Sequence, residues 1–198
     1  MPSATNGRAG DRRSEILDSA AELFARKGIA GTTVREIADE VGMLSGSLYH
    51  HFASKDEMVQ AILVSFVETI ISRYDDVTGR EKDPAKVLDG LIHASIRTAV
   101  EMPHATEVYQ THARQMLESS VQVRTLATDI QKTWIDAIEA GVRAGQLRDD
   151  ISPRVFYRLL RDAMWLTVRW YDPKRQDYSP EQLGDDCASI FLHGFARS

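Results

Sequence analysis

Apolar residues along most of the chain recur at spacings of three and four, which is the period of an amphipathic α-helix. The first such stripe lies within residues 12–27 and consists of Ile16, Leu17, Ala20, Leu23 and Phe24. No stretch shows the strict alternation of apolar and polar residues that marks a half-buried strand. The pattern therefore predicts an all-α fold of about nine helices. The expected helices cover about residues 12–27, 33–42, 45–51, 56–74, 84–100, 103–117, 121–144, 153–171 and 181–195.

Two helix starts carry the spacing of a capping box, in which a hydroxyl and a glutamate three residues later satisfy each other's backbone amides. These pairs are Thr33 with Glu36, and Ser54 with Glu57. Gly42 follows the helix that Thr33 begins, at a position where glycine readily ends a helix. The chain therefore predicts a short helix bounded on both sides, followed by another short helix.

These two short helices, separated by Met43-Leu44, have the proportions of a helix-turn-helix. The apolar residues expected to face inward from the second helix are Leu44, Leu48 and Phe52. The residues expected to face outward are Ser45, Gly46, Ser47, Tyr49 and His50. A helix with small outer residues can lie close to base edges in the major groove of DNA. A helical hairpin with ordinary caps is the alternative on spacing alone.

Potential phosphate contacts flank this pair of helices. Thr33 is placed at a helix N-terminus, where free backbone amides favour anions, while Lys55 and Tyr49 offer polar groups nearby. Arg8, Arg12 and the adjacent Arg13 precede or open the first helix. They would form an arm that reaches the minor groove, or else a solvated chain end.

The run TTVREIADEVGMLSGSLYHHFASKDEM, residues 32–58, resembles the N-terminal module of the TetR-type transcriptional regulators. The resemblance implies a helix-turn-helix DNA-binding domain over residues 1–55 and a ligand-binding and dimerisation domain over residues 56–198. It implies a dimer that binds a palindromic operator in double-stranded DNA. The DNA-contacting residues that it implies are Thr33, Ser45, Gly46, Ser47, Tyr49, His50 and Lys55.

Charge and composition limit the other possibilities. The 198 residues carry 24 Lys and Arg against 29 Asp and Glu, a net charge of −5, so general attraction to DNA is weak and a local motif must carry any binding. The single cysteine, Cys187, excludes an internal disulfide and is expected to be a small buried residue. No apolar run is long enough to span a membrane and no secretory signal is evident, so we expect a cytoplasmic protein.

A stripe of arginines and tryptophan marks residues 154–171, where Arg161, Trp165 and Arg169 are spaced four residues apart. A solvated or ion-paired face would give the same spacing. If the stripe instead faces a cavity, its arginines need an anion, because an unpaired buried charge is costly. Tryptophan adds a flat apolar surface. The stripe then predicts a ligand that is both anionic and partly apolar. Further aromatic and polar candidates for that site are Tyr157, Trp134, Tyr109 and His112.

Three phrases resemble one actinobacterial branch of the same family, whose members repress the late steps of cholesterol catabolism. They are LSGSLYHHFASKDEM, YRLLRDAMWLTVRWYDP and KTWIDAIEAGVRAGQLRDD. This resemblance implies an acyl-CoA effector, a CoA thioester of an indanedione propanoate, and places it at Arg161, Trp165 and Arg169. It implies no bound cofactor.

The family dimerises through its last two helices, here about residues 153–171 and 181–195. The residues expected in this interface are Phe156, Leu160, Met164, Leu183, Cys187, Ile190, Phe191 and Phe195. An enzyme is disfavoured, because no Ser-His-Asp order, glycine-rich phosphate loop or HExxH motif occurs. His104 and His112 are eight residues apart on one predicted helix, so no metal pair is expected. A protein-binding helical adaptor, and activation in place of repression, remain open.

Overall fold

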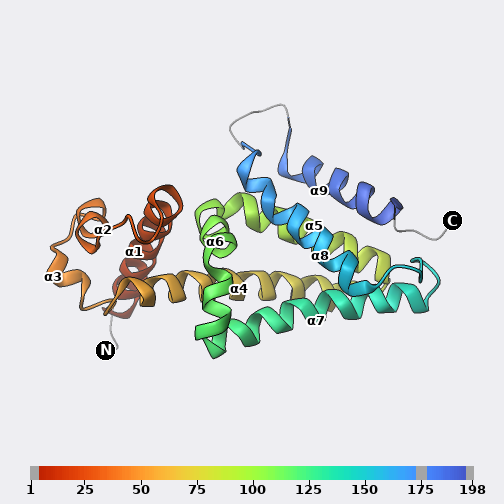
Figure 1. Cartoon of the computed structure of the whole chain (residues 1–198), viewed down its shortest axis with the longest axis horizontal. Helices are drawn as coiled ribbons and strands as arrows, with labels where there is room; N and C mark the ends of the chain where they lie inside the picture. Colours follow the sequence, from red (N-terminus) through yellow and green to blue (C-terminus); the bar gives the residue numbers. More distant parts are fainter. Residues whose placement is uncertain (1–4, 173–177, 195–198) are drawn as a thin grey trace. The chain divides into compact units, whose positions relative to one another are not determined.

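The computed structural model describes residues 5–172 and 178–194, and helices are its regular elements throughout (Figure 1). Within these residues the α-helices are α1 (Thr5–Lys27), α2 (Val34–Glu40), α3 (Ser45–Leu48), α4 (Lys55–Arg80), α5 (Pro84–Glu101), α6 (Pro103–Ser119), α7 (Val121–Arg143), α8 (Pro153–Trp165) and α9 (Pro180–Ala188). A 3₁₀ segment, η1 (Leu166–Arg169), continues α8, and a π segment, η2 (Ser189–His193), continues α9. The predicted all-α fold is confirmed.

Helix starts follow the predicted capping pattern closely. The Thr33 hydroxyl accepts a hydrogen bond from the Glu36 N–H (3.2 Å), and the Glu36 carboxylate accepts one from the Thr33 N–H (2.8 Å). The Ser54 hydroxyl accepts a bond from the Glu57 N–H (3.1 Å). The returning bond of this second pair differs, because the Glu57 carboxylate accepts from the Ala53 N–H (2.7 Å) and not from Ser54. Both prolines at residues 84 and 153 lie in first helical turns, as expected.

Three helix boundaries differ from the predictions. The first helix begins at Thr5 and not near residue 12, and α4 extends to Arg80, into a segment predicted as a loop. The helix predicted to run to residue 171 ends at Trp165. Beyond it the chain tightens to a 3₁₀ turn, in which the Thr167 hydroxyl donates to the Met164 carbonyl (2.5 Å). Such a side-chain bond to the preceding turn competes with the regular helical pattern.

The chain divides into two compact units that interleave along the sequence. The first combines residues up to Phe66 with His104–Val123, and the second combines Val67–Pro103 with residues from Arg124 onward. The two continuous domains expected at residues 1–55 and 56–198 stay a prediction. Helix α4 runs without interruption through both units, with Met58 buried in the first and Ile70 in the second.

The first unit is organised by α1, which packs against α2, and by α2, which packs against α3 (Figure 1). The apolar stripe of α1 is buried as predicted, with Ile16 and Ala20 fully enclosed, except that Leu17 is half-buried. Ile37 from α2 and Leu48 from α3 complete the same core. Burial of these side chains contributes roughly 1.5–3 kcal/mol each for the larger ones, which fixes the two short helices on the longer one.

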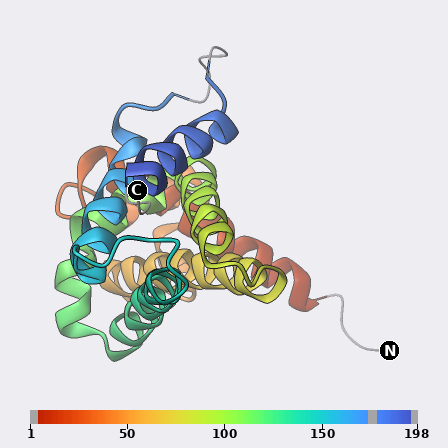
Figure 2. The same ribbon diagram turned by 90° about the vertical axis from the view of Figure 1, so that its right-hand side faces the viewer.

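The second unit is centred on α5, along which both α8 and α9 lie (Figures 1 and 2). Gly184 on α9 makes close approach possible, because a Cβ atom there would lie 2.5 Å from the His93 ring of α5. His93 Nε2 also lies 3.1 Å from an Asp185 carboxylate oxygen. Among the described residues, no helix has the length and apolar character needed to cross a membrane.

Candidate functional site

The turn between α2 and α3 has the predicted helix-turn-helix geometry. Gly42 adopts φ +64°, a left-handed conformation that L side chains rarely adopt. The N–H of Gly42 donates to the Asp39 carbonyl (3.2 Å), and the N–H of Met43 donates to the Ala38 carbonyl (2.8 Å). Ala38 itself is fully buried. These bonds close the end of α2 and direct the chain into α3.

The inner side of α3 is only partly as predicted. Leu48 and Phe52 are buried, but Leu44 is 80% exposed, so its expected inward position is wrong. Leu44 lies just before the helix with extended backbone (φ −73°, ψ 139°). Helical periodicity does not apply to such a residue, so Leu44 does not share the face of Leu48.

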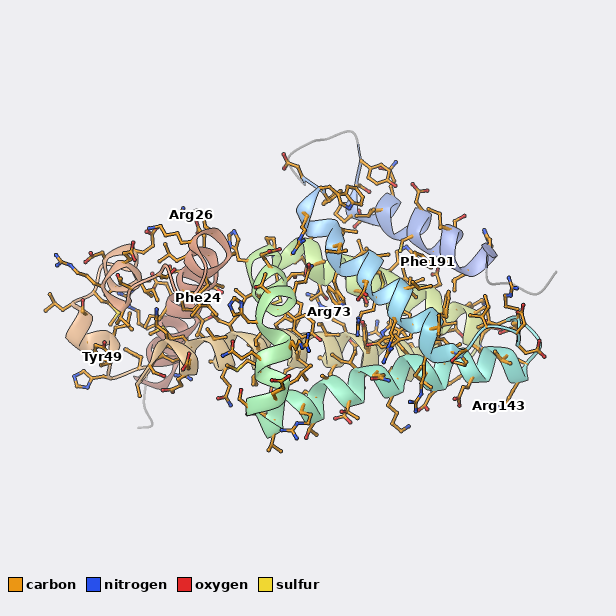
Figure 3. All side chains as sticks on the ribbon, viewed as in Figure 1. Phe24, Arg26, Tyr49, Arg73, Arg143 and Phe191 are labelled. Atoms are coloured by element: carbon orange, nitrogen blue, oxygen red, sulfur yellow. The ribbon has the colours of Figure 1, made fainter. Side chains whose placement is uncertain are left out.

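The outer side of α3 carries the predicted polar and small residues. Gly46, Tyr49 and His50 are exposed, and Ser45 and Ser47 are half-buried. Tyr49 lies just beyond the helix end and is directed away from the core of the first unit (Figure 3). This side of α3 therefore presents short hydroxyl groups, a glycine and one phenol to its surroundings.

The start of α2 already holds a carboxylate. Glu36 accepts bonds from the N–H and the hydroxyl of Thr33 (2.8 and 2.9 Å) and from Lys27 Nζ (2.8 Å). The bonds from Lys27 and Thr33 lower the pKa of Glu36 from 4.5 to about 2. Thr33 as a phosphate contact stays a prediction, because Glu36 occupies the donors that a phosphate would use.

Replacing Glu36 by glutamine is expected to remove a pH-dependent part of the stability of the first unit. The folded pKa of Glu36 is depressed, so its contribution is present above the unfolded value of 4.5 and is lost as the pH falls towards about 2. Thermal melting of both proteins from pH 7 downward should show curves that converge between these values. A difference in melting temperature that stays constant down to pH 2 would contradict this role.

Lys55 has a structural role that the sequence did not reveal. Its ammonium donates to the carbonyls of Ile29 (2.8 Å) and Thr32 (2.7 Å), which lie between α1 and α2. These charge-assisted bonds fasten the start of α4 to that segment. The ammonium of Lys55 therefore already binds two backbone carbonyls, and its contact with a phosphate stays a prediction.

The predicted arginine arm is likewise bound within the first unit. Arg12 donates to the Val41 carbonyl (2.6 Å), and Arg13 donates to the His51 carbonyl (2.9 Å). The Arg13 guanidinium also lies 4.0 Å from the centre of the Phe52 ring. These two residues therefore join α1 to the helix-turn-helix and do not extend from a chain end. The side chain of Arg8 lies outside the described residues.

Sequence reasoning missed Arg35, which lies on α2 two residues after Thr33. Its side chain is exposed, and its Nε lies 3.8 Å from a carboxylate oxygen of Asp39, which is a long distance for an ion pair. A guanidinium so placed is available to a phosphate oxygen. The signal in the sequence that could have indicated Arg35 is the cap at Thr33. The cap marks the start of α2, and Arg35 therefore lies in the first turn, where a cation can reach a phosphate.

The arginine and tryptophan stripe of the second unit is only partly formed. Trp165 is buried, and Arg161 is half-buried with its guanidinium 5.8 Å from the centre of the Tyr157 ring. Arg161 Nε donates to the Asp162 carboxylate (2.9 Å). Arg169 is exposed at the end of η1. Because a 3₁₀ turn has 3.0 residues and not 3.6, Arg169 leaves the predicted stripe by roughly a quarter turn.

The other predicted ligand residues fall into two groups. Trp134 is buried in the second unit between Tyr74 (ring centres 5.9 Å apart) and Tyr157 (6.1 Å). Tyr109 and His112 belong to the first unit, where the Tyr109 ring lies 5.3 Å from the Phe66 ring. The structure therefore brings Arg161, Tyr157 and Trp134 into one region and leaves the two α6 residues in the other unit.

The predicted dimer-forming stripe of α8 is wrong. Phe156, Leu160 and Met164 are buried within the protomer, as is Leu183 of α9. The apolar residues that these elements leave exposed are Val155, Leu159, Leu166 and Ile190. Of the remaining predicted contacts, Phe191 is half-buried, with its ring 6.2 Å from that of Phe156, and Phe195 lies outside the described residues. Val155 and Leu159, four residues apart, therefore form an exposed apolar strip on α8.

Two further predictions concern reactive groups. Cys187 is half-buried, and not fully buried as predicted. Its partial burial raises the pKa of the thiol to about 11, which disfavours a reactive thiolate. Within residues 5–172 and 178–194, no cluster of histidine, cysteine or acidic side chains has the arrangement of a metal site.

Comparison with known proteins identifies the architecture. Residues 16–62 match the model described as bacterial regulatory proteins, tetR family, and residues 81–195 match a tetracyclin repressor-like C-terminal domain. The chain is 39% identical to the HTH-type transcriptional repressor KstR2 of Mycolicibacterium smegmatis, covering 100% of this chain and 97% of that protein. It is 41% identical to KstR2 of Rhodococcus jostii, covering 97% and 94%.

A solved structure extends this similarity to three dimensions. The ketosteroid transcriptional regulator KstR2 of Mycobacterium tuberculosis superposes with a TM-score of 0.87 at 36% identity, covering 94% of this chain and 96% of the other. The regulator PfmR from Thermus thermophilus superposes with a TM-score of 0.81 at 22% identity, which shows the shared fold alone. The match therefore includes both units and is not confined to the helix-turn-helix.

Proposed function

The chain belongs to the TetR family of bacterial regulatory proteins, and we propose that it represses genes of steroid-ring catabolism. Like its family relatives, it is a DNA-binding regulator and not an enzyme. The observation that carries the proposal is full-length similarity to repressors and to a solved regulator whose names refer to KstR2 and to ketosteroids. A regulator of another pathway with a different anionic, partly apolar ligand is the alternative.

DNA recognition is assigned to α2 and α3. The outward residues Ser45, Gly46, Ser47, Tyr49 and His50 would approach base edges and the sugar-phosphate backbone, with Thr33 and Lys55 placed at the edges of that surface. Arg35 supplies an additional cation. The short side chains of α3 permit a close approach of the backbone to the groove, so shape contributes to the choice of sequence.

The repressor acts as a dimer on a palindromic operator, because a two-fold protein matches a two-fold site and doubles a weak half-site contact. Val155 and Leu159 are four residues apart on α8, which places them on one side of it, and the exposed Leu166 begins η1 directly after that helix. Ile190 adds an exposed apolar side chain on the last helical segment. These residues are the proposed dimer contacts.

The effector is an acyl-CoA thioester, and its anionic groups are proposed to bind Arg161. Arg161 donates to Asp162 and lies over the Tyr157 ring, and that ring in turn contacts the buried Trp134. A fused-ring acyl group would use the aromatic side chains. Arg169, Tyr109 and His112 remain predicted contacts. Binding shifts the population towards a form whose two recognition helices no longer fit the operator, with α4 as the segment shared by both units.

The test is an equilibrium titration of labelled promoter DNA from a sterol-degradation gene cluster, followed by fluorescence anisotropy. We expect specific binding that a CoA thioester of a steroid-ring intermediate abolishes and that free CoA leaves intact. Arg161→Gln should keep DNA affinity and need at least tenfold more thioester, whereas Arg143→Gln, on the exposed side of α7 (Figure 3), should behave as wild type. Specific binding that no thioester disturbs would overturn the effector, and absence of specific binding would overturn the repressor.

A further inference from the structure

Leu44 has the highest exposed fraction, 80%, among the large apolar side chains in the described part of the chain. A single exposed leucine is ordinary on a protein surface. This one is informative because of its place, immediately before α3, to which the proposed function assigns DNA recognition. It adjoins Ser45, the first of the proposed base-contacting residues.

The position of Leu44 has a cost in local stability. It is the N-cap residue of α3, a position where serine, threonine, aspartate or asparagine would accept a hydrogen bond from the helix. Leu44 makes no such side-chain bond, and its side chain buries little surface in the first unit. A residue that breaks a local rule without a gain in the folded protein is expected where a function requires it.

The neighbouring side chains leave few other means of reading a base. The residues that follow Leu44, which are Ser45, Gly46 and Ser47, have no long amide or guanidinium group. They cannot make the bidentate hydrogen bonds by which arginine recognises guanine and asparagine or glutamine recognises adenine. The remaining direct signal in the major groove that an aliphatic side chain recognises is the 5-methyl group of thymine.

We infer that Leu44 selects a thymine in each half-site by packing against its 5-methyl group. This inference rests on the proposed DNA-binding function and adds a base-specific contact to it. Small neighbours at residues 45–47 let the backbone approach the groove closely enough for a leucine of this length to reach a methyl group. Loss of one such methyl contact is expected to weaken binding about fourfold per half-site, or about 15-fold for a symmetric operator.

The test combines protein and DNA changes in a double-mutant cycle. An operator is first selected from a pool of random duplexes with the wild-type protein. Each thymine is then replaced by deoxyuridine, which removes only the methyl group. We expect one symmetry-related pair of thymines at which the wild type loses about 15-fold in affinity. Leu44→Ala should bind the thymine operator that much more weakly and show no further loss with deoxyuridine at the same pair.

Two further variants separate recognition from folding. Leu44→Ser restores a capping hydroxyl, so it should be at least as stable as wild type and yet lose sensitivity to the thymine methyl groups. Val121→Ala, which shortens another exposed aliphatic side chain of the first unit, should keep the wild-type response. If Leu44→Ala responds to every deoxyuridine as wild type does, the inference is wrong while DNA binding stands. If no duplex is selected at all, the proposed function fails with it.

Discussion

Replacing Gly46 by glutamate is expected to reduce operator affinity by about 100-fold or more without unfolding the protein. Gly46 is exposed on α3, and a Cβ atom there would meet no neighbour within 4 Å. A carboxylate on this surface would face the phosphates of the groove, and like-charge contact costs several kcal/mol. Each dimer would carry the change in both half-sites. Anisotropy titration with the selected operator measures the loss directly.

A matched substitution keeps this result interpretable. Gly79→Glu changes another exposed helical glycine with open space around it, located at the end of α4 in the second unit. It should leave operator affinity within about twofold of wild type, since surface changes away from a site have small effects. Glutamate is also a better helix former than glycine, so Gly46→Glu should melt no earlier than wild type. Equal affinities for the two variants would contradict the assignment of α3 to DNA.

Replacing Trp134 by alanine is expected to lower the free energy of unfolding by about 3–5 kcal/mol. Trp134 is only 1% exposed, and its ring lies edge-on to Tyr74 (84° between planes) and tilted against Tyr157 (39°). Its removal would leave a cavity among these rings that the surrounding helices cannot fill. Denaturant unfolding followed by circular dichroism, at one protein concentration for all variants, provides the measurement.

Trp170→Ala serves as the comparison, because Trp170 is 62% exposed after the end of η1. Its loss should change stability by no more than about 0.5 kcal/mol. If Trp134→Ala unfolds like wild type and changes only the response to thioester, Trp134 is a ligand contact and not a structural residue of the second unit. If both variants lower the free energy of unfolding strongly and equally, the burial of Trp134 does not explain its effect, and the prediction is contradicted.

Local patterns in the sequence predicted those features that depend on neighbours a few residues away. Ile16, Ala20 and Phe24 of the first stripe are buried as expected. The capping bonds between Thr33 and Glu36, and the left-handed Gly42 after α2, are formed. Each of these depends on helical periodicity or on backbone conformation within one turn, so a single sequence is sufficient to find it.

Features that depend on distant contacts were not predictable in the same way. The α8 helix has two apolar stripes, and the sequence does not show that Phe156 packs inside the protomer while Leu159 is left exposed. Lys55 was assigned to phosphate because its carbonyl partners at Ile29 and Thr32 become neighbours only after folding. The position of Arg169 depends on where α8 ends. Apolar spacing does not reveal that end, where the Thr167 hydroxyl bonds to the Met164 carbonyl three residues earlier.

Selection from a pool of random duplexes tests the central claim most directly. The purified protein is incubated with the pool, bound duplexes are recovered and amplified, and the enriched sequences are compared. A dimer that reads DNA through α3 predicts an inverted repeat with half-sites separated by about one helical turn or a multiple of it. Gly46→Glu should enrich no sequence under the same conditions. Enrichment of no common sequence by the wild type, or the same repeat with Gly46→Glu, would contradict recognition of DNA by this surface.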